Sequence, residues 1–574
     1  VLSLYLNSIF YGNGSFGTEA AAESYFGVQA SQLTLPQASF LAGLPRAPSG
    51  YDPFAGPDAR AGARQRWREV LNSMVATREI TPKQAHAAFT TDIWTRLDAT
   101  HRAALGTARD PGTAHFLDYV VQYLVRTYGV KETYQGGLKV VTTLDLASQR
   151  DAVRRVQHGV AVYRYKGANT GALLAMNPRS GEILAMVGSA SYDDAAISGQ
   201  VNLTLAKRQP GSSFKIYTYG AALEHGLYTA ATKLDDRHPV IDGHRFTDWD
   251  GRLEGMIPLR RAFEESRNLP ALWVYKRLGS QMVIDFARRL GITTPIDPHS
   301  LTVTIGSADV EMIQHLAAYS TFANGGYRVS PHAILRITDD GGRVLESYDG
   351  GGSHVRVISP ELAYLVTSIL RGPVRTELGW PLAGRPVAAK SGTTESWTNA
   401  WWVGYSPDLA VASMMAHIDS GPACKSGFGY LASGFKPTGW MCPTDVLWGE
   451  HVGITVWAPF VESYYRRHPW PADWTRPPGI VTDTVCRQDG NLATATTPAN
   501  QKYDEIFIRG TGEPSATCGG AAADGQPGAQ PAPGAPPTPS PSPGGSPAPA
   551  VTPPRIAPIS PRPSASPSPS PSPT

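Results

Sequence analysis

The stretch RQPGSSFK, residues Arg208–Lys215, continues as IYTYGAALEHG, residues 216–226. The continuation has the apolar spacing of a helix that Gly226 ends, and the Pro-Gly pair marks a turn in front of it. Ser212 and Lys215 are three residues apart, so on a first helical turn their side chains share one face. A neutral Lys215 amine there can take the Ser212 proton, and the helix amino terminus favours the developing negative charge. The stretch therefore predicts a serine nucleophile that works without histidine.

Two further motifs follow in order along the chain. The triplet Ser266-Arg267-Asn268 lies 54 residues after Ser212 and just before a helix that Pro270 opens. The run Lys390-Ser391-Gly392-Thr393 follows in an apolar segment. A lone S-x-x-K occurs by chance in a chain of this length, but the ordered set of three motifs is typical of class A β-lactamases and penicillin-binding proteins.

The first two motifs carry the proton transfers of a serine acyl-transfer reaction. Ser212 is the candidate nucleophile and Lys215 its general base. Ser266 can relay a proton between Lys215 and the leaving nitrogen. We therefore predict these three as the catalytic residues.

The other motif residues are candidates for substrate binding. Asn268 can hold a peptide amide, and Lys390 with Thr393 can bind the carboxylate that ends the substrate. Ser391 and Gly392 belong to the same run, and glycine lets a substrate strand approach the backbone closely. The backbone N–H groups of Ser212 and Thr393 would form an oxyanion hole, in which one donor is typically worth about 10²- to 10³-fold in rate.

The sequence around these motifs resembles the transpeptidase domain of bifunctional, class A penicillin-binding proteins. The segments concerned are RQPGSSFK, LGSQMVIDFARRLGI, LAAYSTFANGGY, and AAKSGTT followed by AWWVGYSPD. GGLKVVTTLD, residues Gly136–Asp145, resembles the interdomain linker of that family, and YLNSIFYGNGSFGTEAAAESYFG resembles the end of its glycosyltransferase domain. The resemblance implies an α+β fold of the β-lactamase-like serine transferase type, with helices flanking an antiparallel sheet, preceded by an α-helical glycosyltransferase remnant.

The local patterns agree with an α+β chain. The capping-box pairs Thr34/Gln37 and Thr81/Gln84 predict helices near the amino terminus. GALLAM and EILAMV on either side of the turn residues 177–181 predict a β-hairpin. Later segments alternate between helical and strand-like patterns, as in α/β or α+β domains. The helical ones are 115–128, 270–290, 310–323 and 359–370, and the strand-like ones are 333–337, 401–405 and 409–415.

The resemblance, together with the shifts in composition, implies five parts. They are a glycosyltransferase remnant (1–105), a linker (106–165), the transpeptidase domain (166–475), a small cysteine-containing extension (476–519) and a tail (520–574). The tail is rich in Pro, Ser and Ala and has almost no large apolar residues. Such a segment cannot bury enough surface to offset its ordering entropy, so we expect it to be disordered.

The four cysteines, Cys424, Cys442, Cys486 and Cys518, contain no C-x-x-C pair. They allow three disulfide pairings. We favour Cys424 with Cys442 and Cys486 with Cys518. Each of these disulfides would close a Gly/Pro-rich loop, and such bonds are stable in an oxidising compartment. Buried free thiols are the alternative.

The composition and motifs of the chain argue against several classes of ligand. The 574 residues include 51 Lys+Arg and 48 Asp+Glu, which gives a net charge of +3. The chain therefore lacks the large excess of positive charge with which nucleic-acid-binding proteins contact phosphates. Gly12, Gly14 and Gly17 match a dinucleotide-binding pattern but follow a helical pattern, so we discard it. The histidines form no H-E-x-x-H or comparable cluster. We therefore expect no metal and no cofactor.

Two acidic residues and several tryptophans have simple structural interpretations. Asp235 and Asp236 lack nearby His or Glu ligands for a metal and are interpreted as turn formers. Tryptophans gather between Trp397 and Trp474, where core packing is favoured over stacking on glycan rings.

The sequence departs from the family in three places. The first catalytic glutamate of the family's glycosyltransferase lies upstream of anything present, and its second stands where this sequence has Ser3. Because a hydroxyl cannot replace a carboxylate in acid–base chemistry, we predict no glycosyltransferase activity in this chain. Asn399 stands where the family often has Asp, which we expect to change a supporting contact only.

The leading hypothesis is a D,D-transpeptidase that crosslinks peptidoglycan stem peptides through a Ser212 acyl-enzyme and is inhibited by penicillin. Its partners would be stem peptides and glycan strands, with β-lactams as inhibitors. A carboxypeptidase or β-lactamase shares the acylation chemistry and differs in deacylation by water. The alternative function, which is not enzymatic, is a penicillin-binding sensor or a wall scaffold.

The resemblance also implies a location. No run of about 18 apolar residues is present, and the chain opens at Val1 without a signal sequence. By resemblance a single membrane-spanning anchor would precede Val1. That anchor would place the chain on the outer face of the bacterial cytoplasmic membrane.

Overall fold

The computed structural model describes most of the chain up to residue 518. The described residues are 5–6, 9–13, 15, 17–48, 50–54, 57–104, 111–135, 137–348, 355–379, 382–394, 399–417, 447–510, 514 and 516–518. Ser3, Cys424, Cys442 and the tail lie outside this set, as do the predictions that concern them.

The amino-terminal region is helical where it is described, as predicted. Its helices are α2 (Thr18–Phe26), α3 (Leu35–Gly43), α4 (Pro57–Ala76), α5 (Pro82–Thr90) and α6 (Trp94–Ala104). The capping box at Thr81 is confirmed, because Thr81 N donates to Gln84 Oε1 at 2.9 Å and Gln84 N donates to Thr81 Oγ1 at 3.3 Å. Phe40 and Trp67 pack edge to face in the separate small core of this region.

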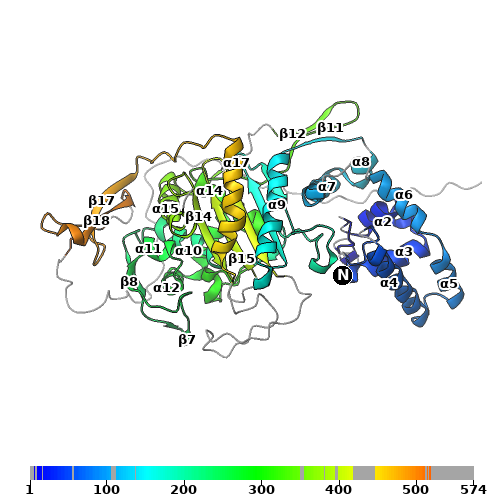
Figure 1. The fold of residues 1–574 in the computed structure, drawn as a ribbon, viewed down its shortest axis with the longest axis horizontal. Coiled ribbons are helices and arrows are strands. Elements are labelled where there is room, and N and C mark those ends of the chain that lie inside the picture. Colours follow the sequence, from blue (N-terminus) through cyan, green and yellow to red (C-terminus); the bar gives the residue numbers. More distant parts are fainter. Residues whose placement is uncertain are drawn as a thin grey trace, which may run out of the picture. The chain divides into compact units, whose positions relative to one another are not determined.

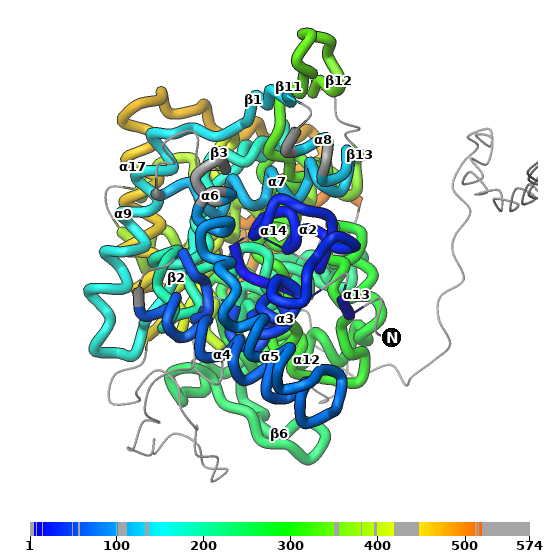
Figure 2. Tube along the Cα trace, turned by 90° about the vertical axis from the view of Figure 1, so that its right-hand side faces the viewer, coloured from blue at the N-terminus to red at the C-terminus, as the bar shows by residue number. Residues whose placement is uncertain are grey.

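The next segment leads from helices into a sheet. It contains α7 (Ala114–Tyr128), α8 (Val130–Gln135), β1 (Lys139–Thr142) and α9 (Leu146–Val162). β1 pairs antiparallel with β11 (Ile334–Thr338), which pairs with β12 (Val344–Ser347). Figure 2 shows these three strands together. The predicted linker therefore contributes a strand, β1, to a ladder whose other strands come about 200 residues later.

A five-stranded antiparallel sheet forms the centre of the larger region. Its strand order is β14 (Ala388–Thr393), β15 (Asn399–Tyr405), β16 (Ala410–Ala416), β2 (Thr170–Met176) and β3 (Ile183–Val187). β2 and β3 are the predicted hairpin. β2 pairs with β16, so strands from the two ends of the domain meet in the middle of the sheet.

Both faces of this sheet are covered by helices. Every residue of β2 is buried, and alternate side chains enter two different cores: Leu174 and Met176 one, Leu173 and Ala175 the other. Figure 1 shows α9 and α17 (Ala458–Arg467) side by side on one of these faces. The predicted antiparallel sheet flanked by helices is confirmed.

Helices also pack against the other face, either directly or as part of the same core. They are α10 (Lys215–Glu224), α11 (Leu259–Glu264), α12 (Asn268–Leu278), α13 (Ser280–Arg289), α14 (Met312–Ala323) and α15 (Pro360–Pro373). The segment predicted to be helical over 270–290 is helical, but it is divided into two helices. Gly279 takes φ 80°, which ends α12 and lets the chain turn into α13.

Short ladders complete the domain. They are β4 (Lys207–Arg208) with β9 (Val310–Glu311), β5 (Lys233–Asp236) with β8 (Gly255–Pro258), β6 (Val240–Ile241) with β7 (His244–Arg245), and β10 (Tyr327–Arg328) with β13 (Val355–Arg356). The predicted packing role of the tryptophans holds for Trp401, Trp402 and Trp457, which are fully buried. Trp397 and Trp440 lie outside the described residues.

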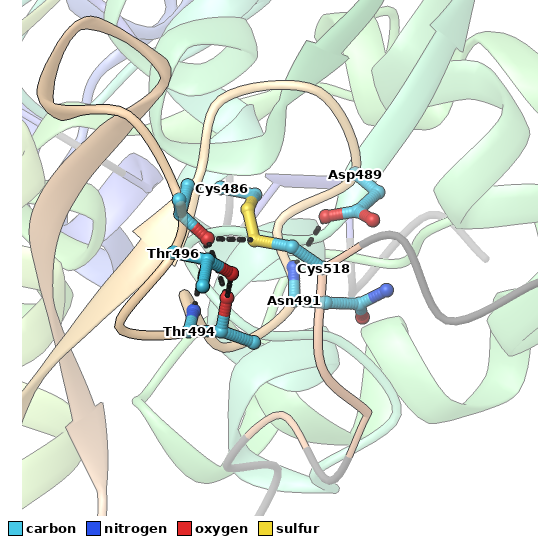
Figure 3. Close-up of a disulfide and its surroundings, with 7 residues drawn as sticks. Cys486, Asp489, Asn491, Thr494, Thr496 and Cys518 are labelled. Carbon is cyan, nitrogen blue, oxygen red and sulfur yellow. Dashed lines mark hydrogen bonds between the residues drawn. A yellow bond between two sulfur atoms is a disulfide. The ribbon is translucent and has the colours of Figure 1, made fainter.

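The extension after α17 is a hairpin tied by one disulfide. β17 (Ile480–Cys486) pairs antiparallel with β18 (Lys502–Ile508). Cys486 is bonded to Cys518, with Cα atoms 6.0 Å apart, which confirms that predicted pairing. Figure 3 shows the bridge beside the loop of Asp489, Asn491, Thr494 and Thr496. The bridge anchors the end of the described chain to this hairpin.

Candidate active site

Ser212 lies on a short turn that precedes the helix. The stretch Gly211–Phe214 forms the 3₁₀ turn η6, and α10 begins only at Lys215. Residues three apart are eclipsed in a 3₁₀ turn, so Ser212 and Lys215 still share the face that the sequence predicted. Ser212 is half-buried, whereas the neighbouring Ser213 is fully buried. Of the two serines, Ser212 is therefore the one that remains accessible.

Two glycines bring the third motif against this turn. A Cβ added to Gly392 in β14 would lie 2.2 Å from Pro210 O, and one added to Gly211 would lie 2.4 Å from Thr393 O. Gly211 also takes φ 56°, which side chains disfavour. β14 and η6 can approach this closely only because both positions lack a side chain. The approach places the Lys-Ser-Gly-Thr run beside Ser212.

Lys215 links the first motif to the second. Its side chain is completely buried, and Nζ donates to Ser266 O at 2.6 Å and to Asn268 Oδ1 at 2.7 Å. Ser266 Oγ lies 3.5 Å from the same nitrogen. These contacts tie Lys215 to both ends of the second motif.

The second motif sits on a strained turn. Ser266 takes φ 59°, a left-handed conformation that is rare for residues with a side chain. Ser266 N donates to Phe263 O at 3.2 Å and Arg267 N to Ala262 O at 2.9 Å, which close the turn before α12 begins at Asn268. Such strain persists where the surroundings hold it, and it is common at functional sites. Here the turn directs the Ser266 carbonyl at Lys215.

Lys390, the first residue of the third motif, has an unusual environment. It is fully buried in β14, and its Nζ donates to Ser391 O at 3.1 Å and Ser391 Oγ at 3.3 Å. Burial lowers the pKa of Lys390 to about 8, although the carboxylate of Glu377 opposes that shift. Burial also raises the pKa of Glu377 to about 7. The charge on Lys390 therefore depends on pH near neutrality.

β14 is an edge strand of the described five-stranded sheet, so only one of its sides pairs with another strand of that sheet. Thr393 Oγ1, near the end of β14, accepts a hydrogen bond from Gly449 N at 3.0 Å. Gly449 opens α16 (Gly449–Val452), so this helix fixes the orientation of the Thr393 hydroxyl. Asn399, the first residue of β15, donates its backbone N–H to Thr394 Oγ1 at 3.1 Å.

His315 forms a hydrogen bond to Ser213 of the η6 turn, and no sequence motif indicated this role. The Ser213 hydroxyl donates its one hydrogen to Pro210 O at 2.8 Å, so at 2.9 Å His315 Nε2 must be the donor to Ser213 Oγ. His315 Nδ1 then accepts from Tyr217 OH at 2.8 Å. Burial lowers the pKa of His315 to about 3, which keeps the ring neutral. The neutral ring therefore helps to hold the η6 turn in place through its hydrogen bond to Ser213.

The structure brings the predicted residues together by two kinds of contact. Lys215, Ser266 and Asn268 are joined by direct hydrogen bonds, and Gly392 and Thr393 reach the Ser212 turn through backbone approach. The roles assigned to them stay predictions. Sequence reasoning missed Glu377, which belongs to no motif, and Arg267, which it treated as a spacer between Ser266 and Asn268.

Comparison with protein families gives three matches along the chain. The model described as penicillin binding protein transpeptidase domain matches residues 171–435. The transglycosylase model matches residues 1–75, and the model described as penicillin-binding protein 1A, C-terminal domain, matches residues 476–520. The three matches follow one another in chain order.

Curated relatives match across most of the chain. Penicillin-binding protein 1A of Aquifex aeolicus is 27% identical over 90% of this chain and 77% of the relative. Penicillin-binding protein 2D of Bacillus subtilis is 28% identical over 91% of this chain and 72% of the relative. Against penicillin-binding protein 1A of Neisseria meningitidis serogroup B the identity is 29%, and the chain spans 64% of that relative.

Solved structures share the fold at low identity. Penicillin-binding protein 1A from Haemophilus influenzae has a TM-score of 0.58 and 22% identity over 90% of this chain and 92% of its own. The PonA1 protein from Mycobacterium tuberculosis, in complex with penicillin V, has a TM-score of 0.52 and 23% identity over 64% of this chain and 96% of its own.

Proposed function

Because the chain belongs to the class A penicillin-binding proteins, we propose that it is a peptidoglycan D,D-transpeptidase in which Ser212 is the acylated nucleophile. The substrate would be a stem peptide ending in D-Ala-D-Ala. Penicillin would acylate the same serine and so inhibit the reaction. The observation that carries this proposal is the convergence of the three motifs on Lys215 and on the η6 turn.

The acylation step that we propose uses three side chains of the first two motifs. Ser212 Oγ attacks the carbonyl carbon of the penultimate D-Ala while its proton passes to a neutral Lys215 amine. When the tetrahedral intermediate collapses, the proton reaches the leaving nitrogen through Ser266 Oγ, which lies 3.5 Å from Lys215 Nζ. The terminal D-Ala leaves, and an amine of a neighbouring stem peptide attacks the ester and restores Ser212.

The third motif and Asn268 would bind the substrate. Lys390 and Thr393 provide a cation and a hydroxyl for the terminal carboxylate. Ser391 and Gly392 lie on the same edge strand, along which the peptide would extend, and Asn268 would hold a peptide amide. The backbone N–H groups of Ser212 and Thr393 would stabilise the oxyanion.

Two incubations of the wild-type protein test this function. The first uses a fluorescent penicillin, and the second uses a D-Ala-D-Ala peptide with an amine acceptor. We expect covalent labelling in the first and D-Ala release with a new amide product in the second. Labelling without turnover would indicate a penicillin-binding sensor, and release without amide product a carboxypeptidase. Absence of labelling would overturn the proposal.

The ionisation of Lys390 predicts a pH-dependent substrate affinity. Its pKa of about 8 means that the cation is present below that pH and is lost as the pH rises through it. We therefore expect the KM for the D-Ala-D-Ala peptide to rise between pH 7 and 9. In Lys390→Arg the guanidinium stays charged and the KM should no longer change over this range.

The variant Glu377→Gln gives an independent check of the same ionisation. Glu377 favours the charged form of Lys390, so its neutralisation should lower the pKa of Lys390 and move the rise in KM to lower pH. Steady-state kinetics across pH 6–9.5 measures both shifts. A wild-type KM that does not vary with pH would contradict this role of Lys390.

We also propose that the segment matching the transglycosylase model contributes no glycosyltransferase activity here. Ser3 stands where the family has a catalytic glutamate, and a hydroxyl does not supply that acid–base chemistry. Ser3 lies outside the described residues. Glycan polymer formed by this chain from a lipid-linked disaccharide precursor would contradict the proposal.

The cell envelope is the proposed site of action. The family match and the peptidoglycan substrate support a location at the outer face of the cytoplasmic membrane. Among the described helices, none has both the length and the apolar character needed to cross a bilayer. The membrane anchor itself remains a proposal from the resemblance.

A further inference from the structure

A buried cluster of one arginine and three aspartates lies next to the second motif. The Arg267 side chain is only 2% exposed. Its Nη2 lies 2.9 Å from Asp236 Oδ2 and 3.3 Å from Asp248 Oδ2, and its Nη1 donates to both carboxylate oxygens of Asp250 at 3.0 Å. Asp236 ends β5 in a completely buried position, so its interpretation as a turn former is wrong. Only Asp235 fits that interpretation, since it accepts from Arg237 N at 2.8 Å.

Two oxygens of this cluster lack a hydrogen-bond donor. Asp236 Oδ1 and Asp248 Oδ2 are both fully buried and receive no hydrogen bond. The two carboxyl groups lie within hydrogen-bonding reach of each other, and Arg267 Nη2 touches both. Two ionised carboxylates in this position would repel each other. One proton shared by the two carboxyl groups would remove this repulsion and supply a donor to the pair.

We propose that Asp236 and Asp248 share one proton and that, together with Arg267, they form a positioning cluster that holds Ser266 and Asn268 against Lys215. The effect on catalysis rests on the function proposed above. The sharing of the proton does not, because it is a property of the folded chain.

The cluster acts on the motif through two direct contacts. Asp248 Oδ1 accepts a short hydrogen bond from Asn268 N, the first residue of α12, and so caps that helix beside the motif. Arg267 follows the left-handed Ser266 in the chain, and its anchored guanidinium fixes the direction in which the backbone leaves that strained turn. Ser266 O and Asn268 Oδ1 are the acceptors of Lys215, so the cluster sets the position of both.

The charges around Asp248 support protonation at this site. Asp236 faces it from β5, Arg267 and the Asn268 N–H from the start of α12, and the phenol of Tyr219 from α10. Burial and the neighbouring Asp236 carboxyl raise the pKa of Asp248 to about 7, against an ordinary value of 3.8. Arg267 and the Asn268 N–H oppose the shift without cancelling it.

This assignment predicts the sign of a pH effect on stability. Between pH 4 and 7 the folded chain keeps a proton that the unfolded chain has lost. The contribution of Asp248 to stability is therefore complete below pH 4 and is lost as the pH rises through 7. Asp248→Asn carries a permanent N–H donor in the same shape as the protonated acid, so it removes this dependence.

The test compares Asp248→Asn and Asp248→Ala with wild type, and uses Asp235→Asn as a matched control. Asp235 is the preceding residue of β5 and contacts Arg237 and His238, outside the cluster. We expect the Tm of wild type and Asp235→Asn to fall more between pH 4 and 7 than the Tm of Asp248→Asn. Equal slopes in wild type and Asp248→Asn would overturn the shared proton, and this readout does not depend on enzymatic activity.

The positioning role is tested by the rate of acylation by a fluorescent penicillin between pH 5 and 9. We expect Asp248→Asn to acylate near the wild-type rate at pH 6 and to exceed wild type increasingly above pH 7. Asp248→Ala should lose about 10²-fold, the usual cost of a displacement of about 1 Å at a reacting group. Wild-type acylation in Asp248→Ala, or equal losses in the Asn and Ala variants, would overturn the positioning role. If wild type itself is not labelled, the proposed function fails while the Tm comparison still tests the shared proton.

Discussion

Replacement of Ser212 by alanine is expected to abolish covalent labelling by penicillin and all transpeptidation. The acyl bond forms at Ser212 Oγ, and no other hydroxyl is accessible on the η6 turn: Phe214 has none, and the Ser213 side chain is fully buried. Gel fluorescence of the labelled protein and the mass shift of the intact chain measure the first effect. Amide product from a D-Ala-D-Ala donor and an amine measures the second.

Ser213→Ala is the matched control for this experiment. Its hydroxyl donates to Pro210 O and accepts from His315 Nε2, so it is engaged in the support of the turn. We expect the variant to keep covalent labelling and to lose stability, by about 1–3 kcal/mol, because a buried N–H of His315 loses its acceptor. Labelling that survives in Ser212→Ala but disappears in Ser213→Ala would show that the nucleophile was assigned to the wrong serine.

Replacement of Lys215 by methionine is expected to slow acylation by about 10²- to 10⁴-fold, the usual contribution of general acid–base catalysis. The variant loses the amine that would take the Ser212 proton, and it also leaves Ser266 O and Asn268 Oδ1 without their donor. Stopped-flow or quenched acylation by a fluorescent penicillin gives the rate. Lys207→Met, at an exposed lysine of β4, serves as the control and should acylate at the wild-type rate.

Lys215→Arg separates the two functions that a lysine can have at this position. A guanidinium can still donate to Ser266 O and Asn268 Oδ1, but it does not lose its proton in the accessible pH range. If Lys215 acts as a base, this variant should be as slow as Lys215→Met. Near-wild-type acylation in Lys215→Arg would show that the site needs a cation there and would refute the general-base role.

Elements governed by neighbouring residues were predictable from the sequence. The Thr81/Gln84 capping box depends on contacts within four residues and is present as expected. The hairpin of β2 and β3 and the strands β15 and β16 follow from short apolar runs bounded by turn residues. The helix predicted over 270–290 divides because Gly279 adopts a positive φ, a choice that the apolar periodicity does not reveal.

The Asp235-Asp236 pair shows where local reasoning stops. Adjacent aspartates are common in turns, and Asp235 does accept from the backbone N–H two residues later. Asp236 instead points inward to Arg267, 31 residues away in the chain. Nothing within the local sequence distinguishes the two, because the difference arises from a partner that only the folded chain supplies.

The sequence alone determined the types of side chain that we propose for the chemistry, and their order: a serine with a lysine three residues on, a serine–asparagine pair, and a lysine followed by Ser-Gly-Thr. The tertiary structure alone decided that Lys215 Nζ meets Ser266 O and Asn268 Oδ1, that Gly211 and Gly392 let β14 approach η6, and that Ser266 is left-handed. It also decided the ionisation of Lys390 and of Asp248. The physical reason is that a pKa and a hydrogen-bond distance depend on burial and on neighbours distant in sequence, and these exist only once the chain has packed.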